Sequence, residues 1–69
     1  MKEIIFIAKD SLDGGYEANA LGYSIFTQGE TTVELKENIL DSVKCHFEID
    51  EQPELIKVNF YREEIIANV

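Results

Sequence analysis

The sequence predicts an α+β domain in which a three-stranded antiparallel meander is followed by one helix and a final strand, in the order β-β-β-α-β. Two segments of strand-forming residues stand on either side of the turn Asp13-Gly14-Gly15. A helix-opening motif at residues 31–34 precedes apolar residues at four-residue spacing. An alternating apolar and polar segment then follows Pro53.

Three segments before residue 30 account for the meander. Residues 3–9 are apolar on both faces of a period-two ribbon, which predicts a strand covered on both sides. Residues 16–20 alternate apolar and polar side chains, as in a strand with one face in water, and the Asp-Gly pair before them favours a tight hairpin. Residues 23–28 are rich in strand formers and end at Gly29.

The helix is predicted from Val33 to about Glu48. In Thr31-Thr-Val-Glu34, the Thr31 hydroxyl and the Glu34 carboxylate are placed to satisfy free backbone N–H groups of the first turn. A broad apolar face follows, formed by Leu35, Ile39, Val43 and Phe47 and widened by Val33 and Leu40. The opposite face is acidic and carries Glu34, Glu37, Asp41 and Glu48, with Lys44 among them. Pro53 ends this region, and alternation from Leu55 to Arg62 predicts the last strand.

A single helix can cover only one face of such a sheet. Because residues 4–7 offer large apolar groups in both directions, we expect a homo-oligomer, either a dimer or a tetramer, that buries the other face. The residues predicted at this interface are Ile5, Ile7, Tyr61 and Ile65. The alternative is that Tyr61, the C-terminal tail and long side chains shield that face within one chain.

Composition excludes several classes of protein. A chain of 69 residues with 45% hydrophobic and 29% charged residues forms one domain, residues 1–69. The net charge of −8 disfavours direct binding of nucleic acid and favours a basic or neutral partner. The longest apolar run, residues 4–8, is too short to span a membrane, and a single cysteine indicates no disulfide framework, so we expect a soluble cytoplasmic protein.

Residues that carry enzyme chemistry are sparse. Cys45 and His46 are adjacent on the predicted helix, where side chains point about 100° apart, and no further ligand stands at metal-binding spacing. The glycines match neither a phosphate-binding loop nor a dinucleotide fingerprint. We therefore predict a non-catalytic protein with no catalytic residue, metal or cofactor.

The chain resembles the N-terminal domain of HicB-type antitoxins from about residue 4 to residue 61. The resemblance is carried by Tyr16-Glu-Ala, Ala20-Leu-Gly-Tyr-Ser24 and Thr27-Gln-Gly-Glu-Thr31, and continues through Glu34-Leu35 and Glu37-Asn38-Ile39. Its most specific part is Gly29-Glu-Thr31 with Glu34 and Asn38. These residues shape turns and helix starts, so the match supports fold more strongly than activity.

The resemblance implies a partial ribonuclease-H-like fold and a protein that binds and masks HicA, a small basic RNA-cleaving toxin. In that family a separate C-terminal segment binds operator DNA, whereas 69 residues leave no room for one, so the likeness is to a short stand-alone branch. The family's Pro and Cys are replaced by Leu21 and Tyr23. We expect Glu34, Glu37, Asp41 and Glu48 to attract the basic toxin. The alternative is an orphan oligomeric domain with another protein or a small molecule as partner.

Overall fold

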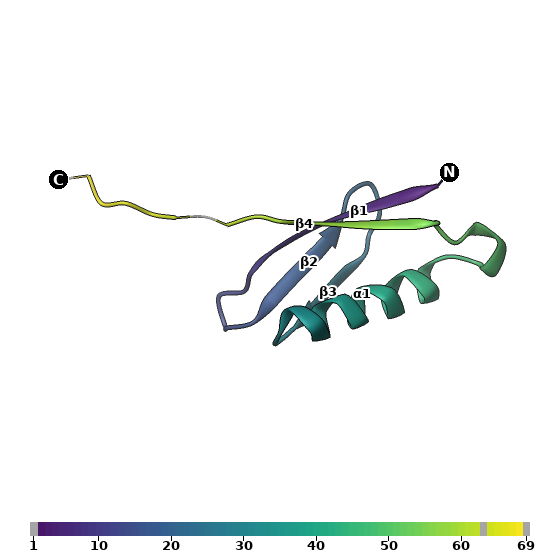
Figure 1. Cartoon of the computed structure of the whole chain (residues 1–69), viewed down its shortest axis with the longest axis horizontal. Coiled ribbons are helices and arrows are strands. Elements are labelled where there is room, and N and C mark those ends of the chain that lie inside the picture. The colour runs from purple at the N-terminus through teal and green to yellow at the C-terminus, as the bar shows by residue number, and fades with distance from the viewer. Residues whose placement is uncertain (1, 63, 69) are drawn as a thin grey trace.

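The computed structural model describes residues 2–62 and 64–68 and has the predicted β-β-β-α-β order. The elements are β1 (Glu3–Asp10), β2 (Tyr16–Ala20), β3 (Phe26–Gly29), α1 (Thr32–His46), the short 3-10 helix η1 (Ile49–Glu51) and β4 (Leu55–Phe60). The strands form one sheet in the order β3-β2-β1-β4 (Figure 1). The first three are antiparallel neighbours, whereas β4 pairs parallel with β1 at the edge of the sheet.

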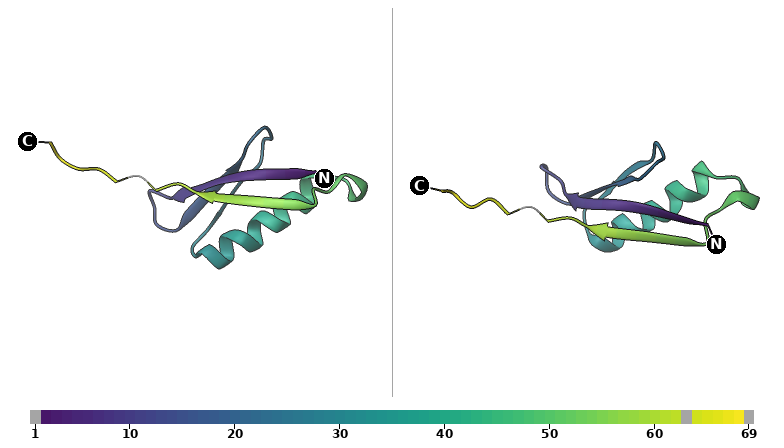
Figure 2. Two further views of the ribbon diagram at one scale, coloured as in Figure 1. Left: turned by 45° about the horizontal axis from the view of Figure 1, so that its top comes forward. Right: turned by 90° about the horizontal axis from the view of Figure 1, so that it is seen from above.

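The core lies between α1 and one face of this sheet (Figure 2). Alternate residues of β1 and β2 point into it, because successive strand side chains leave on opposite faces. The buried members are Ile4, Phe6, Ala8, Ala18, Ala20 and Ile25 from the sheet side and Leu35, Ile39 and Val43 from α1. The helix lies nearest to β3 and β2, and the core extends from it to the central strand β1, which supplies Ile4, Phe6 and Ala8.

The predicted third strand begins three residues too early. Its pairing starts at Phe26, because Gly22 turns the chain with a positive φ of 81° and the Ala20 N–H donates to the Ile25 carbonyl at 3.0 Å. Tyr23 therefore leaves the sheet and packs edge-on against Phe47, with ring centroids 5.1 Å apart.

The helix ends at His46, so the prediction that it reaches Glu48 was wrong. The backbone of Phe47 is extended, although its N–H still donates to the Val43 carbonyl at 3.1 Å. The side-chain amide of Gln52 donates to the carbonyls of Phe47 at 2.7 Å and Lys44 at 3.3 Å. Gln52 thus satisfies backbone acceptors that a helix end leaves free.

Two residues assigned to the core face of the helix are exposed. Leu35, Ile39 and Val43 are buried as predicted, and Phe47 is half-buried against the core. Val33 and Leu40 keep 65% and 49% of their surface exposed. The prediction failed for them because α1 lies nearest to β2 and β3. The side of the helix that carries Val33 and Leu40 is therefore not covered by a strand.

The chain covers only one face of β1, and its tail does not cover the other. Ile5 and Ile7 are half-buried on the face away from α1. The tail after β4 continues away from the sheet (Figure 1), with Ile65 and Ile66 each 86% exposed. The tail therefore does not shield the centre of that face, although long side chains flank it, in the pairs Lys9–Glu17 and Lys57–Glu3. No helix in the described part of the chain is long and apolar enough to cross a membrane.

Candidate protein-binding surfaces

Polar chemistry in the described residues lies on the outer surface. Residues 2–62 and 64–68 include no buried polar or charged residue and no group of three His, Cys, Asp or Glu side chains that could hold a metal ion. Cys45 and His46 are both exposed. His46 packs edge-on against Tyr23 and Phe47, with ring centroids 5.8 and 4.9 Å apart, so it takes part in an aromatic contact at the end of the helix.

The first candidate surface is the outer face of α1, where Glu34, Glu37 and Asp41 are exposed. The Thr31 hydroxyl accepts the Glu34 backbone N–H at 3.1 Å, which confirms the predicted N-cap. The return bond from the Glu34 carboxylate is absent among the hydrogen bonds of the described residues. That carboxylate is therefore directed to solvent, where the helix N-terminus favours its negative charge.

Glu48 lies apart from these three acids in the chain. It is exposed, but it precedes η1 instead of belonging to α1, because the helix ends before it. None of the four predicted acids forms an ion pair within residues 2–62 and 64–68. We call the exposed residues Glu34, Glu37 and Asp41 the acidic helix face.

The structure adds an acidic hollow that sequence patterns did not reveal. Asp13, Glu30 and Glu34 line it together with Tyr16 and Gln28. Pairing of Tyr16 with Gly29 brings the β1–β2 turn against the start of α1. The approach is so close that a Cβ at residue 15 would lie 2.7 Å from the Gly29 carbonyl oxygen. Both glycine turns are recognisable in the sequence, but they lie next to each other only because β2 pairs with β3.

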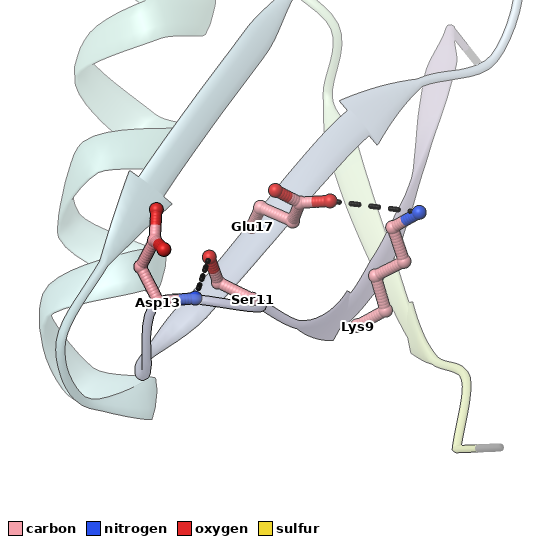
Figure 3. A network of polar contacts seen from close by, with 4 residues as sticks. All are labelled: Lys9, Ser11, Asp13 and Glu17. Carbon is pink, nitrogen blue, oxygen red and sulfur yellow. Dashed lines mark hydrogen bonds and ion pairs between the residues drawn. The ribbon is translucent and has the colours of Figure 1, made fainter.

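The second candidate surface is the sheet face away from α1, which we call the open sheet face. Its centre is formed by Ile5 and Ile7, both half-buried. Ion pairs flank them: Lys57 meets Glu3 at 2.9 Å, and Lys9 meets Glu17 at 3.5 Å. Figure 3 shows the Lys9–Glu17 pair between β1 and β2, beside the turn in which the Ser11 hydroxyl accepts the Asp13 N–H.

The four residues predicted at an oligomer interface do not all meet on that face. Ile5 and Ile7 are neighbours on β1, and Tyr61, 58% exposed, follows β4 beside the other end of β1. The Tyr61 N–H donates to the Ala8 carbonyl at 2.7 Å. Ile65 lies in the tail and lines a hollow with Tyr61 and Lys9. The structure therefore places two of the four residues at the centre of the open sheet face and two near its end.

The chain is similar to UPF0150 proteins of two other organisms. It is 50% identical over 66 residues to a UPF0150 protein of Thermotoga maritima, which covers 96% of this chain and 93% of that protein. It is 52% identical over 52 residues to a UPF0150 protein of Archaeoglobus fulgidus, which covers 75% of this chain and 77% of that protein. No family model matches the chain, and no solved structure matches it significantly. Neither relative's name states an activity, a substrate or a partner.

Proposed function

The chain belongs to the UPF0150 family, and we propose that it is a non-catalytic, HicB-like antitoxin-type protein that binds and masks a small basic RNA-cleaving toxin. The acidic helix face is the observation that carries this proposal. Its three carboxylates are exposed and form no ion pair within the described residues. A cationic partner can therefore approach them without displacing an internal counter-charge.

Two further features add to the attraction of a basic partner. The acidic hollow adds Asp13 and Glu30 next to Glu34, at the N-terminal end of α1. The whole chain carries a net charge of −8, which attracts a basic protein over distances comparable with the Debye length. Charge complementarity of this kind increases the association rate and disfavours acidic partners.

The residues that carry the resemblance to HicB have clear structural roles. Thr31 caps α1, and Gly29 lies so close to the helix that a Cβ there would be 2.5 Å from the Leu35 nitrogen. The Asn38 side-chain amide donates to the Gln28 carbonyl at 2.7 Å and joins α1 to β3. These contacts support a HicB-like domain, whereas the proposed binding activity depends on the charged surface.

The proposal is tested by capture followed by inhibition. The tagged chain is used to isolate partners from its native cells, and any small basic protein recovered is purified and assayed for cleavage of single-stranded RNA. We expect the partner alone to cleave RNA and an equimolar amount of this chain to suppress cleavage. A partner that does not cleave RNA, or whose cleavage the chain leaves unchanged, would contradict the proposal.

The binding face is tested separately by charge reversal. Glu37→Lys with Asp41→Lys is expected to weaken binding about tenfold or more at low salt, mainly by slowing association. Asp50→Lys with Glu51→Lys makes the same change in net charge at exposed positions in η1, beyond the C-terminal end of α1, and serves as the control. Equal loss in the two double variants would show that net charge acts without a local face. Binding that the first pair leaves intact would remove the face assignment.

A second candidate function is an orphan oligomeric domain whose partner is another protein or a small molecule. The open sheet face favours it, because Phe26 and Leu55 at its margins are 52% and 44% exposed beside half-buried Ile5 and Ile7. Absence of a short basic reading frame near the gene would support this candidate over the first. In this second candidate function, the oligomer contact is formed by Ile5, Ile7, Tyr61 and Ile65.

A further inference from the structure

We propose that two copies of this chain associate by exchanging their C-terminal tails, so that residues 64–68 of each copy pair antiparallel with the free edge of β4 in the other. This surface differs from the acidic helix face and from the open sheet face. Self-association through it requires no toxin, so its test is independent of the proposed antitoxin activity.

The edge of β4 has backbone groups available for pairing. β4 is the outermost strand and pairs only with β1 within the described sheet. The N–H groups of Leu55 and Tyr61 point toward β1: that of Leu55 donates to the carbonyl of Lys2, just before β1, at 3.3 Å, and that of Tyr61 to the carbonyl of Ala8 at 2.7 Å. Backbone groups of a strand alternate in direction, so the even-numbered positions 56, 58 and 60 direct their N–H and C=O outward. Such an edge is a template for another strand.

A partly covered apolar surface lies beside this edge. On the side of the sheet that faces the helix, Ile56 and Val58 are half-buried and Phe60 is 50% exposed. Leu40 of α1 is 49% exposed and lines a hollow with Ile56. The only charged residue within β4 is Lys57, which is on the other face in its ion pair with Glu3. On its helix side β4 itself thus lacks the charges that usually prevent association, and Lys44 and Glu54, of opposite charge, line the hollow beside it.

The tail has the complementary properties. Ile65 and Ile66 are each 86% exposed, and the tail continues beyond β4 in an extended course (Figure 1). Folding back onto its own β4 would require a tight turn within Tyr61-Arg-Glu-Glu64. That segment contains no Gly, Asn, Asp or Pro, the residues that tight hairpins use. The edge of a second copy is therefore the better acceptor.

Symmetry restricts how the two copies can pair. A two-fold axis perpendicular to the sheet keeps the helix side of each copy on the same face, so even-numbered residues oppose even-numbered residues. With the axis at Tyr61, Ile66 lies opposite Ile56 of the second copy and covers the hollow beside Leu40. Five extended residues span about 17 Å, which is most of the roughly 20 Å occupied by the six residues of β4. Both copies make the same contacts, as a closed dimer requires.

The first test is the mass of the full chain in solution, measured by size-exclusion chromatography with light scattering at about 100 μM. We expect twice the chain mass for the parent and for Ile66→Leu, and the monomer mass for Ile66→Lys and for a chain lacking residues 64–69. Ile7→Lys, on the open sheet face, is the control and is expected to remain dimeric. A monomeric parent, a dimer that persists without residues 64–69, or dissociation by Ile7→Lys alone would overturn the proposal.

The second test is amide hydrogen exchange along β4, which contains its own control. In the parent, the N–H groups at the even positions 56 and 58 are expected to exchange slowly because the second copy accepts them. In the chain lacking residues 64–69 they should exchange at least tenfold faster, while positions 57 and 59, which face β1, stay protected. Fast exchange at the even positions of the parent would refute the pairing. Far-UV circular dichroism confirms that the shortened chain is folded.

Discussion

Replacing Gly29 with alanine tests the contact on which the position of the helix depends. Gly29 ends β3 and is buried against the first turn of α1. A Cβ at this position would lie 2.5 Å from the Leu35 nitrogen, 2.7 Å from the Leu35 Cα and 2.9 Å from the Glu34 carbonyl carbon. All three atoms belong to backbone inside a helix, so they cannot yield as the end of a flexible side chain does. The helix must move away from the sheet instead.

The size of the effect follows from this overlap. Forcing one extra methyl group into a packed site costs about 1–3 kcal/mol, and contact with rigid backbone places Gly29→Ala near or above about 3 kcal/mol. A 69-residue domain has a total stability of roughly 3–10 kcal/mol. The substitution therefore removes a large fraction of the stability. Gly14→Ala is the matched control: its added Cβ meets nothing within 4 Å, and its positive φ of 91° costs about 1 kcal/mol.

The assay is urea unfolding followed by circular dichroism of the helix, with all proteins at one concentration because the midpoint of an oligomer depends on it. With a slope near 1 kcal/mol per molar urea, the Gly29→Ala midpoint should fall by about 3 M or the helix signal should be absent without denaturant. Gly14→Ala should lower the midpoint by about 1 M on the same slope. Equal shifts in the two variants would refute the argument that close approach of β3 and α1 requires glycine.

Three smaller perturbations test other contacts by thermal or urea unfolding. Thr31→Ala removes the N-cap and is expected to cost about 1 kcal/mol, or roughly 4–8 °C in melting temperature, and an unchanged melting temperature would contradict the cap. Ile39→Ala should cost about 2–5 kcal/mol, whereas Val33→Ala should stay within about 0.5 kcal/mol, and similar values for both would contradict their different burial. Asn38→Ala, which loses the bond to the Gln28 carbonyl, should cost about 0.5–1.5 kcal/mol, and no cost would show that this bond adds nothing to stability.

Local signals were sufficient to predict the order of elements. Tyr16–Ala20 has the predicted bounds because alternation and a glycine turn both operate within a few residues. The start of α1 is predicted equally well, because the Thr31 cap involves the next three residues only. The end of α1 was predicted less well. Gln52, five residues beyond Phe47, supplies the hydrogen bond at that end, and no helix-stop rule identifies it.

Longer-range features could not be obtained from these patterns. The parallel pairing of β4 with β1 joins residues more than fifty positions apart, and alternation within Leu55–Phe60 does not reveal its neighbour. Leu40 fails as a core residue for the same reason: a helical face specifies which side is apolar but not how far the sheet extends beneath it. Asp13 and Glu30 of the acidic hollow are brought together only by the pairing of Tyr16 with Gly29.

The position of α1 on the sheet separates the acidic helix face from the edge of β4 that accepts the tail. Gly29 and the bond from Asn38 to Gln28 hold α1 over the β2–β3 half of the sheet. The same placement turns the acidic helix face outward and leaves the helix side of β4 only partly covered at the opposite edge. Because no residue is shared between the two surfaces, a tail-exchanged dimer should present two independent acidic faces. Charge reversal at residues 37 and 41 should therefore leave the dimer mass unchanged, and Ile66→Lys should leave the affinity of each chain for a basic partner unchanged. Coupling between the two would contradict this division of the molecule.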